Sequence, residues 1–217
     1  MGTNAADLAA DQPANHAAPS EAGGADPLGT AGQLLVFAHG DEASAFTDVP
    51  HLVTGVGKVD AATVLGKALA DAREAGQPIR RVVVLGTAGI ISDDHDLDTV
   101  VQITGAVQHD INVSKPRIAI EPAVLDKTAT IATGDQFVTS DQQRIEIAAL
   151  GASLVDMEIY AYAAVCKAYG VPLYVFKIPS DFADSSTTDQ EWDEIVFLKS
   201  RQLREFFNSE LPQLLGS

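Results

Sequence analysis

The sequence is poor in cysteine and in basic side chains, and both shortages limit what the protein can do. Cys166 is the only cysteine among 217 residues, so no intramolecular disulfide can form and a reducing cytoplasm is the expected location. The chain has 30 acidic residues against 14 Lys and Arg, which gives a formal net charge of −16. This balance argues against nucleic acid or an anionic membrane surface as a partner, because both require a basic face.

Long apolar runs and targeting signals are also missing. No stretch is long and apolar enough to span a membrane. The first Lys or Arg is Lys58, so we expect no secretory signal, which would begin with a region of such residues. Residues 1–31 are rich in Ala, Gly, Pro, Asp and Asn and predict a disordered or loosely packed tail, followed by one domain over residues 32–217.

The part after residue 31 contains runs rich in Val, Ile and Leu that alternate with helical patterns, which favours an α/β fold. The predicted strands are 33–38, 51–55, 80–86, 153–156 and 171–178, and residues 97–110 and 128–137 alternate as strands do. The predicted helices are 57–76, 157–170 and about 191–215. We expect a single domain with a central mixed, mostly parallel twisted sheet flanked by helices. In such a sheet the functional loops gather at the carboxyl ends of the strands.

Three carboxylates follow three different predicted strands. Glu42 lies after the first strand, Glu158 directly before a predicted helix, and Asp181 after the last strand. Each has an ordinary explanation when taken alone: a surface residue, a charge at a helix N-terminus, or a turn cap. Together on one rim they predict acid/base chemistry on a polyhydroxylated substrate.

Other motifs carry less information. Residues 86–89, "GTAG", predict a tight turn where backbone can approach a ligand, and residues 55–58, "GVGK", lack the rest of a phosphate-loop frame. His95 and His109 stand in separate loops, so we expect no metal site. Cys166 lies in an apolar helical pattern and is interpreted as a core residue rather than a catalytic thiol.

The segment "VDMEIYAYAAVCKAYGVPLYVFKIPSDFAD", residues 155–184, resembles the signature region of the purine nucleoside phosphorylase/nucleosidase superfamily. Further matches are "FAHGDEASAF", "TGVGKVDAATVLGKAL", "VVVLGTAGII", "HDINV" and "TGDQFVTS", so the resemblance covers roughly residues 33–210. It is closest to the 5′-methylthioadenosine/S-adenosylhomocysteine nucleosidases. The resemblance implies a nucleoside phosphorylase-like fold, a homodimer, a small-molecule purine nucleoside as substrate, and no metal or organic cofactor.

The resemblance also implies roles for individual residues. Glu42 would activate the attacking water, and Asp181, aided by Ser180, would donate a proton to N7 of the purine. Thr87 and Lys177 would help to hold the water, where the family usually has Ser and Arg. The implied substrate-binding residues are His39, Val56, Ala88, Gly89, Phe137, Val138, Met157, Glu158 and Trp192.

Among the substrate-binding residues, the resemblance implies that Glu158 binds the ribose hydroxyls and that Phe137 stacks on the base. Phosphorylase relatives bind phosphate with Arg side chains at the positions of Ser44 and Val84. A phosphate dianion needs such basic groups, and Glu42 would repel it, so water is the expected nucleophile. A phosphate-dependent phosphorylase and a non-catalytic nucleoside-binding or storage protein are the alternatives.

Two departures from the nucleosidase pattern concern the 5′ end of the substrate. His39 replaces a frequent Met, and residues 114–117, "SKPR", replace an apolar-aromatic stretch. Both changes make the expected 5′ pocket more polar. Lys115 and Arg117 are either contacts for an anionic 5′ substituent or solvated surface charges. The identity of the 5′ substituent is therefore left open.

Overall fold

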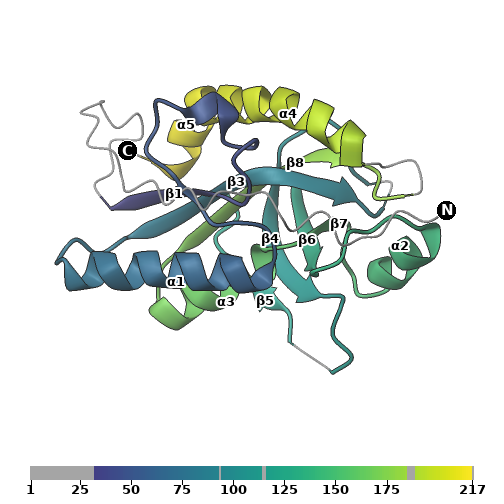
Figure 1. The fold of residues 1–217 in the computed structure, drawn as a ribbon, viewed down its shortest axis with the longest axis horizontal. Helices are drawn as coiled ribbons and strands as arrows, with labels where there is room; N and C mark the ends of the chain where they lie inside the picture. Colours follow the sequence, from purple (N-terminus) through teal and green to yellow (C-terminus); the bar gives the residue numbers. More distant parts are fainter. Residues whose placement is uncertain (1–31, 93, 114–115, 185–188, 217) are drawn as a thin grey trace.

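The computed structural model describes residues 32–92, 94–113, 116–184 and 189–216, and of residues 189–193 it describes the backbone only. In this part of the chain, an eight-stranded sheet lies between helices on its two faces (Figure 1). The predicted tail over residues 1–31 and the candidate contact Lys115 lie outside the described residues.

The elements follow one another in an α/β order that agrees with the predicted class. The strands are β1 (Gln33–Phe37), β2 (Leu52–Val53), β3 (Arg81–Ile90), β4 (Val101–Gln108), β5 (Ile118–Ala119), β6 (Thr128–Thr133), β7 (Leu154–Asp156) and β8 (Leu173–Asp181). The helices are α1 (Lys58–Glu74), α2 (Asp141–Ala148), α3 (Ile159–Tyr169), α4 (Asp189–Ser209) and α5 (Leu211–Leu215), with a 3-10 turn η1 (Ser44–Phe46).

The sheet is mixed and mostly parallel, as predicted, but it also closes on itself. β3 pairs in parallel with β1 and β8, and β1 pairs in parallel with β2. β8 pairs antiparallel with β4, β4 runs parallel to β6, β6 parallel to β7, and β7 returns antiparallel to β3. Strands β3, β8, β4, β6 and β7 therefore form a ring, with β1, β2 and β5 outside it.

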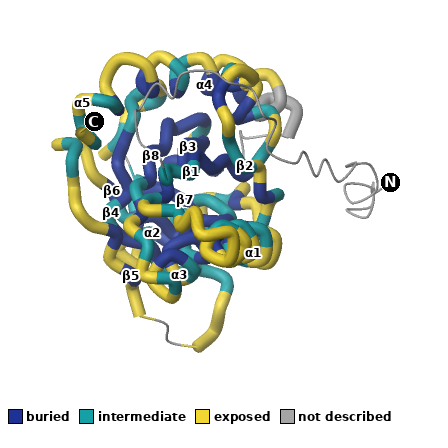
Figure 2. Tube along the Cα trace, turned by 90° about the vertical axis from the view of Figure 1, so that its left-hand side faces the viewer, coloured by how far each residue is buried: buried dark blue, intermediate teal, exposed yellow. Residues whose placement is uncertain are grey.

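The alternation of side chains along β3 builds a core on each face of the sheet. Val82 and Val84 pack into the cluster that includes α1 and α3, whereas Val83 and Leu85 pack into the cluster that includes α4 and α5. Figure 2 shows the buried strands inside and the exposed faces of the helices outside. β3 is covered on both faces, which explains its continuous apolar run.

Three local features differ from the sequence prediction. The predicted turn at residues 86–89 is wrong, because β3 continues to Ile90 and pairs with β8 as far as Gly89, with a register shift after Ala88. The predicted single C-terminal helix is divided at Glu210 into α4 and α5. Helix α2 was not predicted because its sequence is mostly polar and only Ile147 is buried. The predicted stop of α3 at Gly170 is confirmed, with a left-handed φ of 68°.

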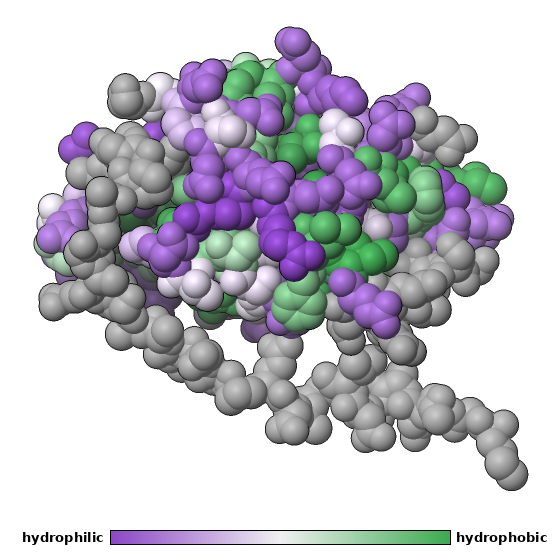
Figure 3. All heavy atoms as spheres, turned by 90° about the horizontal axis from the view of Figure 1, so that it is seen from above, coloured by the Kyte–Doolittle hydropathy of each residue, from purple (hydrophilic) through white to green (hydrophobic). Residues whose placement is uncertain are grey.

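Figure 3 shows the α4 face as mainly hydrophilic with apolar patches, and Phe197 and Leu198 are exposed on α4. Among the residues described, no helix has the length and apolar character needed to cross a membrane.

Candidate active site

Glu42 lies between β1 and η1 with its carboxylate buried against β3. The backbone nitrogen and the Oγ1 of Thr87 both donate to Oε1 of Glu42, at 2.7 and 2.9 Å. The backbone nitrogen of His39 donates to Oε2 at 3.2 Å. Ser200 of α4 donates to the Glu42 carbonyl oxygen at 2.7 Å. Strand β3 and the loop after β1 thus fix the orientation of this carboxylate, and α4 holds the backbone of Glu42; a general base needs such a fixed position.

Lys177 is buried beside Glu42, in a space that Gly86 keeps open. A Cβ on Gly86 would stand 3.0 Å from Oε1 of Glu42 and 3.1 Å from Nζ of Lys177. Nζ also lies 3.4 Å from Oδ2 of Asp156. Burial alone would lower the pKa of Lys177, but the charges of Asp156, Glu42 and Glu158 outweigh it and raise this pKa above its ordinary value. The ammonium group therefore stays charged and neutralises part of the carboxylate cluster.

Asp156, and not Glu158, caps helix α3. Oδ2 of Asp156 accepts from the backbone nitrogen of Ile159 at 3.0 Å, and Oδ1 accepts from Oγ1 of Thr133 at 2.7 Å. Glu158 makes no cap hydrogen bond to α3 and accepts instead from the backbone nitrogen of Gly57 at 2.9 Å. The helix-terminus explanation considered for Glu158 therefore applies to Asp156. Asp156 is a site residue that the sequence analysis missed, although it is the first acid of "VDME".

The surroundings of Glu158 favour its protonated form. Burial, followed by the negative charge of Asp156, raises the pKa of Glu158 from 4.5 to about 8. Lys177 and the Gly57 N–H group lower the pKa but only in part. Near neutral pH this carboxyl group therefore carries a proton, so it can donate to one hydroxyl group of a sugar and accept from another.

Asp181 is the last residue of β8. Its carboxylate belongs to a second group of polar side chains, which lies farther along β3 than Glu42 and Lys177. Oδ2 of Asp181 accepts from Oγ of Ser180 at 2.7 Å, and Oδ1 accepts from the backbone nitrogen of Ala183 at 2.8 Å. Gly89 makes room here, because its Cβ would stand 3.1 Å from Oδ1 of Asp181 and 2.8 Å from the Cβ of Ala183. Ala183 has a φ of 48° and packs in one apolar cluster with Val138. A strained residue that holds a carboxylate is common at functional sites.

The polar group around Glu42 and Lys177 and the polar group around Asp181 both lie against strand β3. Gly86 is paired with Lys177 and Gly89 with Asp181 in the β3–β8 register. The two glycines of "GTAG" therefore admit the side chains of the site rather than forming the expected turn. This arrangement places the carboxylates of Glu42 and Asp181 along β3, and a pair of carboxylates is what glycoside hydrolysis commonly uses.

The remaining predicted substrate-binding residues are placed less tightly. The carbonyl oxygen of Ala88 lies 3.4 Å from Oγ of Ser180. Met157 is half-buried in the turn that leads to α3. The His39 Nδ1 accepts from the backbone nitrogen of Asp41 at 3.2 Å and lies 3.4 Å from its carboxylate.

Four further candidates are not joined to the site by the contacts described. Val56 and Phe137 are each 44% exposed. Trp192 belongs to α4, but its side chain is outside the described part of the structure. The guanidinium of Arg117 covers Gly105 of β4, where a Cβ would meet its Nε and Nη2.

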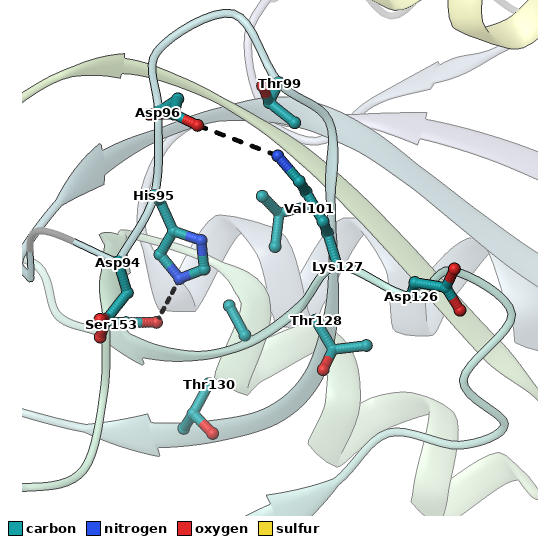
Figure 4. Close-up of a pocket in the computed structure, with 11 residues that line it drawn as sticks. Asp94, His95, Asp96, Thr99, Val101, Asp126, Lys127, Thr128, Thr130 and Ser153 are labelled. Atoms are coloured by element: carbon teal, nitrogen blue, oxygen red, sulfur yellow. Dashed lines mark hydrogen bonds and ion pairs between the residues drawn. The ribbon is translucent and has the colours of Figure 1, made fainter.

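A polar cavity of about 370 Å³ lies elsewhere, at the first residues of β4 and β6 (Figure 4). Nε2 of His95 is 2.7 Å from Oγ of Ser153, and Nζ of Lys127 is 3.9 Å from Oδ2 of Asp96. Burial lowers the pKa of His95 below its ordinary value. None of the predicted site residues lines this cavity. Across the described residues, no group of three or more His, Cys, Asp or Glu side chains could hold a metal ion.

Comparison with known protein families and curated proteins gives two findings. The sequence profile of the Phosphorylase superfamily matches residues 30–207, well over half of the chain. The aminodeoxyfutalosine nucleosidase of Helicobacter pylori strain J99 is 27% identical over 162 residues, which cover 63% of this chain and 70% of that protein. The protein of the same name from strain 26695 is 26% identical over the same length.

Solved structures share the fold. A futalosine hydrolase mutant of Helicobacter pylori strain 26695 superposes with a TM-score of 0.72 at 20% identity, over 84% of this chain and 99% of that one. The 5′-methylthioadenosine/S-adenosylhomocysteine nucleosidase of Neisseria meningitidis, in complex with methylthio-immucillin-A, gives a TM-score of 0.73 at 20% identity, over 85% and 100%. These likenesses support the ring-closed α/β architecture described above.

Proposed function

The chain belongs to the phosphorylase superfamily, and we propose that it is an N-ribosyl hydrolase acting on an adenosine-type purine nucleoside. The products are the free base and the free sugar, with water as the nucleophile. The observation that carries this proposal is the buried carboxylate of Glu42, held at one oxygen by both donors of Thr87. The nucleosidases among the relatives support hydrolysis as the reaction.

The charge around Glu42 suits water better than phosphate. Lys177 already faces the carboxylates of Glu42 and Asp156. Val84, at one of the two Arg positions of phosphorylases, is buried in the apolar core, and Ser44, at the other, is exposed. A phosphate dianion would meet more carboxylates than cations here, and bidentate Arg groups are missing from both positions.

In the proposed reaction, Glu42 activates water at one end of the site and Asp181 protonates the leaving base at the other. Glu42 takes a proton from water, whose oxygen attacks C1′ while the C1′–N9 bond breaks and its electron pair moves to the purine. Asp181 donates a proton to N7 and so neutralises the leaving base. Each oxygen of Asp181 accepts one hydrogen bond in this structure, which holds the carboxyl group in place and leaves it a further site for the purine.

Glu158 is the proposed ribose clamp. Its carboxyl group would bind the sugar hydroxyls, and the carboxylates around the sugar would stabilise the positive charge that develops at C1′. The protonated form favoured near neutral pH supports a mixed donor and acceptor role. Met157 would pack beneath the sugar, and Phe137 would stack on the base.

The 5′ substituent distinguishes the candidate substrates. The relatives are named for aminodeoxyfutalosine and for 5′-methylthioadenosine and S-adenosylhomocysteine. We propose a nucleoside of this adenosine type with a 5′ end that meets His39 and Val56. Arg117 lies exposed and covers Gly105, which supports the solvated-surface interpretation of this side chain.

The test is chromatography of products from adenosine, 5′-methylthioadenosine, S-adenosylhomocysteine, aminodeoxyfutalosine, inosine and AMP in phosphate-free buffer. We expect base release from at least one adenosine-type nucleoside, and none from the Glu42→Gln variant. Asp41→Asn is the matched control, because Asp41 is a neighbouring acid whose side chain is 41% exposed. Tight binding of adenine without any turnover would favour a binding protein instead.

A homodimer and a cytoplasmic location are further proposals that follow from the resemblance and from the single cysteine. Light scattering of the purified protein tests the first. A monomer at concentrations where the protein is active would contradict it.

A further inference from the structure

Lys58 is the one residue of "GVGK" whose side chain the proposed reaction does not use, yet it lies at the centre of a charged cluster. Nζ of Lys58 donates to both carboxylate oxygens of Asp110, at 2.6 and 2.8 Å, and to Oε1 of Gln108 at 3.2 Å. Nζ also lies 3.7 Å from Oδ2 of Asp135. The side chains of Lys58 and Asp110 are only 19% and 9% exposed, so this pair is shielded from solvent, whereas the side chain of Asp135 is 46% exposed.

The cluster joins three loops that are far apart in sequence. Lys58 begins α1, Asp110 follows β4, and Asp135 follows β6. The backbone nitrogen of Lys58 donates to Oδ1 of Asp135 at 2.7 Å, and the backbone nitrogen of Asp135 donates to Oδ2 of Asp110 at 2.7 Å. Each of the three residues is therefore bonded to the other two.

The preceding residue connects this cluster to the site. Gly57 has a φ of 95°, and a Cβ on it would stand 3.2 Å from Oδ1 of Asp135. Its backbone nitrogen donates to Oε1 of Glu158 at 2.9 Å. The first N–H groups of α1 are thus bound by the carboxyl group of Glu158 and the carboxylate of Asp135, which satisfies two donors that a helix N-terminus leaves without partners in the helix.

We propose that Lys58 is a positioning residue that holds the Gly57 N–H group against Glu158 and so shapes the ribose site. Without its ammonium, Asp110 and Asp135 repel each other, and the loops they belong to separate. Glu158 then loses its donor, and the loop that carries Phe137 shifts. This inference rests on the proposed function of the same site.

The same contacts exclude a phosphate-binding role for Lys58. Its ammonium already faces the carboxylates of Asp110 and Asp135, so an incoming phosphate would meet two negative charges. A phosphate-loop lysine must instead be free to reach the phosphates.

The kinetic test compares Lys58→Met with Lys67→Met, a control on the same helix whose side chain is 73% exposed and paired with Asp71. We expect Lys58→Met to raise KM about tenfold or more, with kcat less affected, because binding of the ribose is what weakens. Lys58→Arg should recover most of the loss, and Asp110→Asn should shift KM in the same direction. Lys67→Met should stay within about twofold of wild type.

An unchanged KM in both Lys58→Met and Asp110→Asn would overturn the proposal. So would a loss of kcat alone that matches a smaller folded fraction in thermal unfolding, because that result indicates a purely structural role.

Hydrogen exchange tests the positioning role without any turnover. In the wild type, the amides of Gly57, Lys58 and Asp135 should exchange slowly because each donates to a side-chain carboxyl oxygen. In Lys58→Met they should exchange about tenfold faster or more, while β3 keeps its protection. Unchanged exchange at these amides would overturn the inference even if the enzyme hydrolyses nucleosides. A wild type that hydrolyses no nucleoside would overturn the proposed function alone.

Discussion

Thr87 donates two hydrogen bonds to one carboxylate oxygen of Glu42, from its backbone nitrogen at 2.7 Å and from Oγ1 at 2.9 Å. The two residues are 45 positions apart, and the β1–β3 pairing brings them together. Because both donors bind the same oxygen, they fix the plane of the carboxylate. A base held in this way is aligned before substrate binds.

Thr87→Val should lower kcat/KM by about ten- to a hundredfold, because a hydrogen bond to a charged group contributes roughly 1.5–3 kcal/mol. Valine matches the shape of threonine but lacks the Oγ1 donor. Thr87→Ser keeps the donor and should stay close to wild type. Initial rates of the wild type and both variants with the preferred nucleoside measure this effect. A Val variant as fast as the Ser variant would show that the hydroxyl plays no part in turnover.

Lys177→Met should lower the free energy of unfolding by about 3–5 kcal/mol, because it leaves buried carboxylates without their cation. Lys177 is fully buried and 3.4 Å from Asp156. Lys177→Arg keeps the charge and should lose much less. Urea denaturation at one pH measures all three proteins. Equal midpoints for the Met and Arg variants would contradict the role of the charge.

Glu158 should make stability depend on pH in a defined direction. Its pKa is about 8 in the folded protein, against an ordinary value of 4.5, so the folded state binds a proton that the unfolded state releases. The resulting stability is fully present below about pH 4.5 and is lost as the pH rises through about 8. Over that interval the wild type should lose on the order of 1–3 kcal/mol relative to Glu158→Gln.

Urea denaturation of wild type and Glu158→Gln across this interval provides the measurement. A difference between the two proteins that does not change with pH would show that the pKa of Glu158 is the same in the folded and the unfolded protein.

Cys166 should be unreactive in the folded protein. Burial raises the pKa of its thiol to about 12, and the thiolate is the reactive form. A thiol reagent should therefore label the native protein slowly and the urea-unfolded protein rapidly. Cys166→Ala should keep its turnover. If the native protein were labelled rapidly and lost its turnover as a result, the Cys166 thiol would have to be considered as a catalytic group.

The elements with a strong local pattern could be predicted from the sequence, including β3, α1 and the stop of α3 at Gly170. The ring of strands could not be predicted, because it is closed by the antiparallel β3–β7 and β4–β8 pairings. The hydrophobic periodicity of a strand does not indicate which strand it pairs with. Helix α2 lacks an apolar stripe and left no signal of this kind.

For the site, too, some residues could be predicted from the sequence, and others depend on contacts that exist only in the packed fold. The structure places Glu42 in contact with Thr87, and the roles that the resemblance implied for both residues stay predictions. Asp156 was missed because its importance lies in contacts with Lys177 and Thr133 that only the packed sheet creates. Lys58 appeared as part of a failed phosphate-loop motif, and its partners Asp110 and Asp135 are 52 and 77 residues away in the chain.

The identity of the sugar product tests the central claim most directly. Mass spectrometry of a completed reaction, run with inorganic phosphate present, separates free sugar from sugar 1-phosphate. Water as the nucleophile at Glu42 predicts free sugar in equal amount to the released base, at a rate that phosphate does not change. Sugar 1-phosphate as the product, with base release that requires phosphate, would contradict the account.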